Sequence, residues 1–147
     1  SALHWAAYDN DLGAVRRLLA EGADPNTANR FGVTPLHEAA TIGNAEMLKA
    51  MLEAGGDPNA AFGEGESVLM TAARAGNAES VRLLLAHGAD VDASEHWHGQ
   101  TALMWAAMEN HADVVQILID AGAAVPARSA PAKPGGRPFF FTSSNET

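Results

Sequence analysis

The run His96-Trp97-His98 is the densest group of potential metal ligands in the sequence. In an extended backbone, alternate side chains point to one side, so both imidazoles would face the same direction. Two nitrogen ligands leave a zinc site incomplete, and folding would have to supply Glu95 or Glu66 as a further ligand. We therefore interpret this run as an exposed turn, and we predict that the chain holds neither a metal ion nor another cofactor.

The run Gly63-Glu64-Gly65-Glu66-Ser67 has the glycine content of a phosphate-binding loop. It lacks the lysine with which such loops neutralise phosphate, and it carries two carboxylates in that place. Because carboxylates repel phosphate, the electrostatics of this run are wrong for anion binding. Ser67 is placed instead to cap a helix.

Candidates for covalent or acid–base catalysis are also missing from the sequence. The chain has 147 residues and no Cys, which excludes disulfides, thiolate metal ligands and cysteine nucleophiles. None of its serines stands in the G-x-S-x-G setting of an activated nucleophile. Neighbouring carboxylates such as Asp9 and Asp11 would need an enclosed pocket to separate their pKa values. We predict no catalytic residues and no enzymatic activity.

The elements that position these side chains belong to a unit that recurs along the chain. The unit TPLHEAA begins at Thr34, and partial copies begin at Ser1, Ser67 and Thr101, at intervals of 33, 33 and 34 residues. Four copies at one period indicate a repeat array, in which each unit buries its apolar face against the next. No apolar run approaches the roughly 18 to 20 residues that a membrane span needs.

Every unit carries the residues that begin and end helices. We interpret the opening Ser or Thr as an N-cap, because its side chain can accept a hydrogen bond from the free amides of a helix start. Nine residues later comes Asn or Gly, the two residue types that accept the left-handed conformation closing a helix. These helix stops are Asn10, Gly43, Gly76 and Asn110.

A second apolar run follows each stop, with apolar residues three and four positions apart as on the buried face of a helix. These residues are Val15, Leu18 and Leu19; Leu48, Met51 and Leu52; Val81, Leu84 and Leu85; and Val115, Leu118 and Ile119. Each run ends at a further glycine, namely Gly22, Gly55, Gly88 or Gly122. The sequence therefore predicts an all-α fold with two helices in each unit.

With these features in place, each unit resembles an ankyrin repeat, whose pattern is a turn, a TPLH-type helix, a second helix and a Gly-Ala-Asp loop. The sequence around Ser67 and Thr101 is similar to segments of multi-repeat ankyrin proteins of bacteria. The resemblance implies a solenoid of stacked antiparallel helix pairs with short projecting β-turn fingers. We place the array at residues 1–127, with repeats at approximately 1–28, 29–61, 62–94 and 95–127.

The resemblance also assigns structural roles to most histidines. It implies that His4 and His37, at the TPLH histidine position, bond to the capping hydroxyl and to neighbouring loops. Met70 and Met104 replace that histidine in the third and fourth units, where we expect apolar packing. His111 follows a helix stop, and we interpret it as structural too.

Both ends of the sequence look cut. Ser1 already lies at a helix N-cap, so we expect a fragment of a longer protein. The second helix of the fourth unit is the most apolar of the set and no polar capping repeat follows it, so we expect a further element to cover it. The Pro- and Gly-rich tail, residues 128–147, should be disordered or truncated. Its Phe139-Phe140-Phe141 could dock on that helix or begin another element, and both alternatives stay open.

The array is acidic, and this bears on its partners. Residues 1–125 carry six Lys and Arg against seventeen Asp and Glu, while the rest of the chain carries three against one. Phosphate backbones repel such a surface, which argues against nucleic acid as a partner. The charge favours a basic or mixed-charge protein, bound by a monomer or by part of a longer array.

The resemblance implies that the turn tips and the outer part of each first helix line a concave groove. The turn-tip residues are Arg30, Phe31, Val33, Glu64, Glu66, Trp97, His98 and Gln100. The first-helix residues are Tyr8, Asp9, Thr41, Ile42, Arg74, Ala75, Met108 and Glu109. The four units differ most at these positions, which suggests that packing does not constrain them.

Exposed aromatic and arginine side chains most often carry interface energy, so Tyr8, Phe31, Arg74 and Trp97 are the first candidates for contact with a partner. The alternative that Phe31 and Trp97 stiffen adjacent turns stays open. We expect Trp5 and Trp105 to pack between repeats. The one extra residue near Glu95 should push Trp97 outward.

The function that follows is a non-enzymatic protein-interaction module. Two other interpretations remain: an accessory array of a larger enzyme or secreted factor, and a structural spacer whose groove binds nothing. Fold resemblance alone supports binding only by association, because sites and not folds set function.

Overall fold

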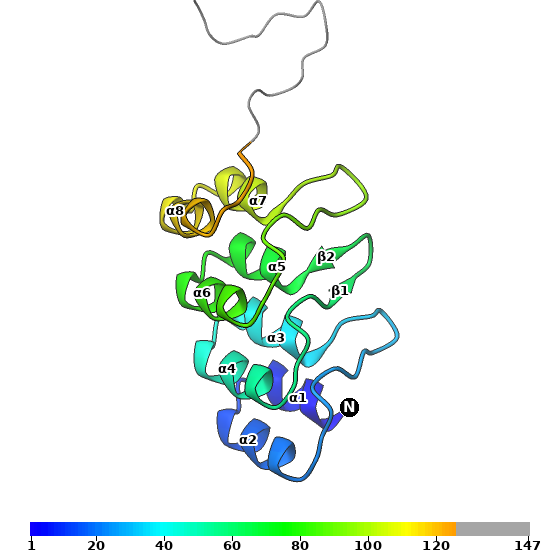
Figure 1. Cartoon of the computed structure of the whole chain (residues 1–147). Helices are drawn as coiled ribbons and strands as arrows, with labels where there is room; N and C mark the ends of the chain where they lie inside the picture. Colours follow the sequence, from blue (N-terminus) through cyan, green and yellow to red (C-terminus); the bar gives the residue numbers. More distant parts are fainter. Residues whose placement is uncertain (126–147) are drawn as a thin grey trace, which may run out of the picture.

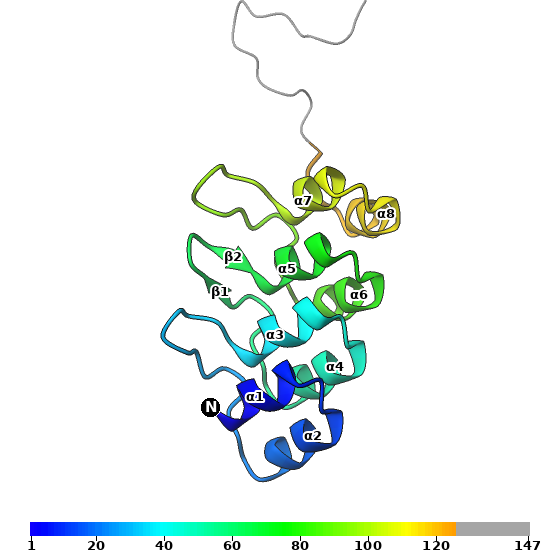
Figure 2. The same cartoon turned by 180° about the vertical axis from the view of Figure 1, so that it is seen from behind.

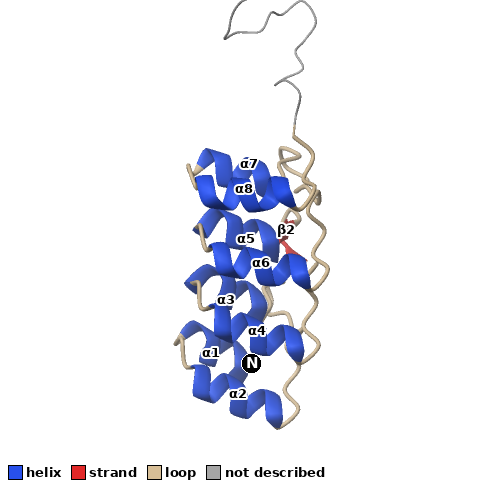
Figure 3. Cartoon of the chain, turned by 60° about the vertical axis from the view of Figure 1, so that its left-hand side comes forward, coloured by secondary structure: helices blue, strands red, loops and turns tan. Residues whose placement is uncertain are grey.

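The computed structural model describes residues 1–125 of the chain, and this part is a single stack of helix pairs (Figure 1). The helices are α1 (Ala2–Tyr8), α2 (Leu12–Ala20), α3 (Pro35–Ile42), α4 (Ala45–Glu53), α5 (Val68–Ala75), α6 (Ala78–Ala86), α7 (Ala102–Met108) and α8 (Ala112–Asp120). The two helices of each pair lie side by side, and the pairs follow one another in chain order (Figure 3). The predicted all-α repeat solenoid is confirmed.

Helix starts and stops fall where the residue types predicted them. The side-chain oxygen of Ser1, Ser67 or Thr101 accepts the N–H of the residue three positions further on. Asn10 and Asn110 take positive φ angles of 58° and 64° after the first and last of the odd-numbered helices. Such angles are rare for a residue with a side chain, and Asn is among the few that accept them.

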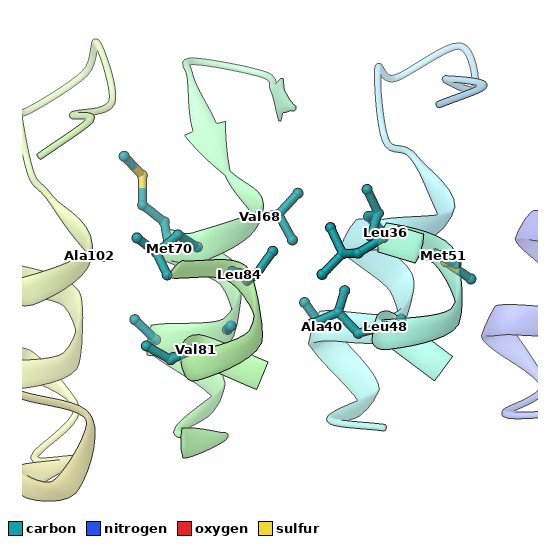
Figure 4. Close-up of a cluster of buried hydrophobic side chains, with 14 of the residues drawn as sticks. Leu36, Ala40, Leu48, Met51, Val68, Met70, Val81, Leu84 and Ala102 are labelled. Atoms are coloured by element: carbon teal, nitrogen blue, oxygen red, sulfur yellow. The ribbon is translucent and has the colours of Figure 1, made fainter. Parts of the chain in front are cut away.

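The core lies between neighbouring pairs, not around one centre. The odd-numbered helices contact one another in sequence, α1 with α3, α3 with α5 and α5 with α7, and the even-numbered helices do the same. Leu36, Leu48, Met51 and Leu84 are fully buried in these contacts (Figure 4). Each pair therefore depends on its neighbours for burial of its apolar side chains.

Alanine residues allow the odd-numbered helices to approach closely. Ala39 and Ala40 of α3 and Ala72 and Ala73 of α5 are fully buried. Larger side chains there would push the helices apart, because protein interiors are close-packed. The methionine that replaces the TPLH histidine in α5, Met70, is buried and points towards the fourth pair (Figure 4).

One expectation about the buried face of α8 is wrong. Leu118 is buried as predicted, but Ile119 is 41% exposed and Val115 is only partly buried, whereas Val114 is fully buried. The reason is that α8 packs on α6 and α7 within residues 1–125. Among residues 1–125, no further helix covers the side of α8 that faces away from α6 and α7, whereas α4 and α6 each lie between two even-numbered helices.

Longer connections leave the stack between one pair and the next, all on the same side as the odd-numbered helices (Figures 1 and 2). We call residues 28–33, 61–66 and 94–100 the inter-repeat loops. The second of them contains a short antiparallel hairpin of β1 (Ala61–Phe62) and β2 (Glu66–Ser67), in which Ala61 pairs with Ser67 and Phe62 with Glu66. The third is closed by a bridge between Ser94 and Thr101.

Asparagine side chains tie consecutive pairs together where the even-numbered helices end. Oδ1 of Asn26 accepts the N–H of Asp57 at 2.7 Å, and its Nδ2 donates to the carbonyl oxygen of Gly55 at 3.0 Å. Asn59 repeats this arrangement with Asp90 and Gly88, at 2.7 and 3.2 Å. Each clamp joins a loop to the helix end of the next pair and satisfies both backbone groups.

Two further observations bear on the sequence predictions. Within residues 1–125, every helix is too short or too polar to cross a membrane. The tail from residue 126 onwards, with Phe139-Phe140-Phe141, lies outside the described residues. The two alternatives for the tail therefore stay predictions.

Candidate partner-binding surface

The odd-numbered helices share one exposed side, which turns towards the inter-repeat loops (Figure 2). It is formed by the fourth, seventh and eighth residues counted from each helix start. These residues are Trp5, Tyr8 and Asp9; Glu38, Thr41 and Ile42; Thr71, Arg74 and Ala75; and Trp105, Met108 and Glu109, of which Thr71 is buried and the others are partly or fully exposed. Together with the inter-repeat loops they form what we call the loop-side face.

Most of the exposed large apolar side chains in residues 1–125 lie on this loop-side face. They are Trp5 (67% exposed), Tyr8 (64%), Phe31 (69%), Ile42 (38%), Trp97 (74%) and Met108 (64%), and only Ile119 and Val125 lie elsewhere. Exposed apolar side chains that gather on one face mark an interaction site more often than scattered ones do.

The tips of the first and third loops present their aromatic rings to solvent. The ring of Trp97 stacks on that of His98, with centroids 4.5 Å apart, and Arg30 stands 5.7 Å from the centroid of Phe31. Both contacts stay within one loop. Trp97 is 74% exposed, and Phe31 in the shorter first loop is 69% exposed.

The expected packing of Trp5 between repeats is wrong. Trp5 is 67% exposed, whereas the small residues Ala6 and Ala7 of the same helix are buried. Trp105 holds the equivalent position in α7, but it is partly buried because the guanidinium carbon of Arg74 stands 4.9 Å from its ring centroid. Tryptophan is therefore exposed in the first unit and partly covered in the fourth, because the third pair supplies an arginine that packs on Trp105.

Glu66 and Arg74, two of the predicted contact residues, bind each other. Nη2 of Arg74 lies 2.9 Å from Oε2 of Glu66, and Oγ1 of Thr71 donates to the same oxygen at 2.7 Å. Their charged groups are therefore engaged within the chain. At the next loop, Nε2 of Gln100 contacts Sδ of Met108 at 3.3 Å, which joins the loop to α7.

Glu95 holds the third loop in shape, a role that the sequence reasoning missed. Its carboxylate is buried and accepts the N–H groups of His98 at 2.6 Å and Gly99 at 3.1 Å. These backbone donors, with His98 the strongest, hold the pKa of Glu95 below its usual range. The equivalent residue in the first loop is Asn29, whose Oδ1 accepts the N–H groups of Phe31 and Val33.

The longer side chain of Glu95 matches a longer loop. Asn29 bonds through its own N–H to Val33, four residues on, whereas Glu95 bonds in the same way to Gln100, five residues on. The signal in the sequence was the combination of one inserted residue with Glu in place of Asn. The second and third loops also contact each other, since the N–H of His96 donates to the carbonyl oxygen of Glu64 at 2.6 Å.

The histidines have the structural roles that the resemblance implied. Nε2 of His4 donates to the carbonyl oxygen of Val33 at 2.7 Å, and its Nδ1 pairs with Oγ of Ser1 at 2.8 Å. His37 is bonded equivalently to Glu66 and Thr34. Burial lowers the pKa of His37 from 6.5 to about 4, so the ring is neutral at physiological pH.

His111 also has a structural role, because it links two helix pairs of the stack. Its Nε2 donates to the carbonyl oxygen of Arg74 at 3.0 Å and joins the fourth pair to the third.

The described residues contain no group of three His, Cys, Asp or Glu side chains arranged to hold a metal ion. Of the candidate metal ligands in the third loop, His98 stacks on Trp97, and the carboxylate of Glu95 accepts backbone N–H groups.

A hollow of about 360 Å³ lies at the α1 end of the loop-side face. It is lined by Ser1, His4, Trp5, Tyr8, Asn29 and Glu38, which come from α1, the first loop and α3. The rings of Trp5 and Tyr8 meet edge to face, with centroids 6.1 Å apart.

Comparison with known families agrees with this architecture. Residues 3–95, and again residues 43–129, match the family model described as ankyrin repeats (3 copies). Together the two matches span most of the 147 residues. Ankyrin repeats are generally protein–protein interaction modules and are typically non-catalytic. The stacked helix pairs, the cap and stop residues and the two matches show that the chain belongs to the ankyrin repeat family.

Proposed function

We propose that the loop-side face is the concave binding surface of a non-enzymatic protein-interaction module, with the inter-repeat loops as its projecting fingers. One observation carries the proposal: six of the eight exposed large apolar side chains in residues 1–125 lie on this face. Large exposed aromatic side chains are the residues that most often dominate interfaces. The proposal concerns the array, whether it acts alone or within a larger enzyme or secreted factor.

Tyr8, Phe31 and Trp97 are the anchors of this surface, since each is a largely exposed aromatic. Arg74 and Glu66 support the surface, because their charges are already paired. The remaining contact residues surround the anchors: Asp9, Arg30, Val33, Thr41, Ile42, Glu64, His98, Gln100, Met108 and Glu109. The acidic composition of the array favours a basic or mixed-charge protein as the partner.

Affinity capture with matched variants tests the proposal. The first variant combines Tyr8→Ala, Phe31→Ala and Trp97→Ala on the loop-side face. The control variant combines Arg17→Ala, Lys49→Ala and Arg82→Ala, which are exposed residues of the even-numbered helices. Both should keep the melting midpoint of the wild type, because exposed substitutions usually change stability by no more than about 0.5 kcal/mol. A partner retained by the control and lost by the first variant supports the proposal, and a partner retained by both contradicts it.

A further inference from the structure

We propose that the hollow between Trp5, Tyr8 and Glu38 takes an arginine side chain of the protein partner. This inference rests on the proposed function and specifies the chemistry of one contact. It combines three observations: two exposed rings set at right angles, a carboxylate without a cation, and an occupied site of the same chemistry elsewhere in the chain.

The shape of the hollow suits a long side chain. Its volume of about 360 Å³ is at the lower end of the range for small-ligand pockets, which begins at about 300 Å³. Trp5 and Tyr8 line it with planes inclined at 86°. The faces of such rings are electron-rich and attract cations.

The lining contains one charged acceptor, the carboxylate of Glu38, and it is not paired with a cation among residues 1–125. Oγ of Ser1 pairs with Nδ1 of His4, whose Nε2 donates to a backbone carbonyl. Oδ1 of Asn29 accepts two backbone N–H groups. The carboxylate of Glu38, by contrast, has no Lys, Arg or His within ion-pair distance among residues 1–125, where the pairs are Arg16 with Glu46, Arg74 with Glu66 and Arg82 with Glu79.

Glu38 is also partly buried, so solvent satisfies it less well than it would a fully exposed carboxylate. A cation entering between Glu38 and the two rings would gain an ion pair and a cation–π contact together. The excess of acidic over basic residues in the array would draw a basic segment towards this face.

The chain fills a site of the same chemistry with its own arginine. Arg74 stands 4.9 Å from the centroid of Trp105 and binds Glu66 at 2.9 Å, so a guanidinium lies between an indole and a carboxylate. Arginine suits such a site better than lysine, because its planar guanidinium stacks on rings and can pair with both carboxylate oxygens. The Trp5 hollow offers the indole and the carboxylate without the guanidinium.

The test follows the three indole N–H signals of the ¹⁵N-labelled chain, assigned with Trp5→Phe and Trp97→Phe, during titration with the peptide acetyl-Gly-Arg-Gly-amide. Matched peptides carry lysine, or citrulline, which has the shape of arginine without its charge. We expect a saturable shift of the Trp5 signal with the arginine peptide. Citrulline in the peptide, or Glu38→Gln in the chain, should weaken binding by about fivefold, the scale of one exposed cation–π or ion-pair contact.

The control variant is Glu64→Gln, an exposed carboxylate on the same face outside the hollow, and it should leave the affinity unchanged. Equal binding of the citrulline peptide, or equal shifts of all three indoles, would overturn the arginine site. Cross-linking of a partner from Phe31 and Trp97 is a separate measurement. If it succeeds while the peptide titration fails, only the arginine site is lost, and if it fails, the proposed function itself is lost.

Discussion

Arg74 of α5 covers the ring of Trp105 in α7, with its guanidinium carbon 4.9 Å from the ring centroid. The same guanidinium binds Glu66 at 2.9 Å, so one side chain joins a loop, its own helix and the next pair. Arg74 thus contributes to the order of the loop-side face rather than offering a free charge to a partner.

Arg74→Ala should therefore lower the free energy of unfolding by about 1 kcal/mol, through loss of the cation–π contact and the partly buried ion pair. Urea denaturation measures the change. Arg82→Ala is the matched control, because Arg82 pairs with Glu79 at a site where both side chains are about 60% exposed, and its effect should be smaller. Equal losses for the two variants would show that the contact with Trp105 contributes nothing.

Asp92→Asn should stabilise the stack by about 0.5 to 1 kcal/mol, the net value of a typical hydrogen bond. Asp92 occupies the position of the Asn26 and Asn59 clamps, and its Oδ1 accepts the N–H of Ala124 at 2.8 Å. A carboxylate has no N–H to donate, so only half of the clamp forms.

The Asn59→Asp substitution is the reciprocal control for this prediction. It removes the donor that reaches the carbonyl oxygen of Gly88 and should destabilise the stack by a similar amount. Thermal melting of both variants gives the comparison. The clamp interpretation fails if Asp92→Asn leaves the midpoint unchanged while Asn59→Asp lowers it.

Ser80→Ala should raise the free energy of unfolding by about 1 kcal/mol, because burying an unpaired hydroxyl costs free energy. Ser80 is fully buried in α6, and its hydroxyl has no hydrogen-bond partner. The equivalent positions of the other even-numbered helices hold Ala14, Met47 and Val114.

Ser67→Ala should act in the opposite direction, since the Ser67 hydroxyl accepts the N–H of Met70 as a helix cap. Chemical denaturation of the two variants would separate the roles of these serines. A loss of stability for Ser80→Ala would mean that its hydroxyl has a partner in solution.

Stability should fall as the pH falls from 6.5 towards 4, because the pKa of His37 is 6.5 in the unfolded chain and about 4 in the folded one. The unfolded state binds the proton first, so protonation favours unfolding in this window by up to about 3 kcal/mol. His37→Met copies the residue found at Met70 and removes this dependence.

The measurement is the unfolding free energy of wild type and variant at several pH values between 4 and 7. The difference between the two curves isolates His37 from the carboxylates that titrate in the same range. Substitution of the exposed His87 by Gln serves as the control and should preserve the slope. A His37→Met variant with the wild-type slope would place the pH dependence elsewhere.

The helix ends could be predicted from the sequence because they depend on local hydrogen bonding. Ser67 caps its helix and Asn110 takes the left-handed conformation for reasons contained within a few residues. The period of the repeat predicted the solenoid for another reason, because similar units bury the same apolar face against their neighbours.

The exposure of side chains on the loop-side face could not be predicted in the same way, because it depends on the neighbouring pair. Trp5 and Trp105 follow similar local sequences, yet only Trp105 has an arginine against it. The pairing of Glu66 with Arg74 likewise depends on how a loop folds over its helix. The predicted burial of Ile119 was wrong for a related reason, since no described helix covers the side of α8 that faces away from α6 and α7.

Site-specific photo-cross-linking tests the central claim, that the loop-side face binds a protein partner, most directly. A photoreactive residue placed at Phe31 or Trp97 probes the loops, and one placed at Lys49 or Arg82 probes exposed positions of the even-numbered helices. The account predicts that extracts of the source cells give one protein adduct from both loop positions and none from the helix positions. Excess unlabelled wild type should suppress this adduct, and the Tyr8→Ala, Phe31→Ala, Trp97→Ala variant should not. Adducts of equal yield from all four positions, or from Lys49 and Arg82 alone, would contradict the account.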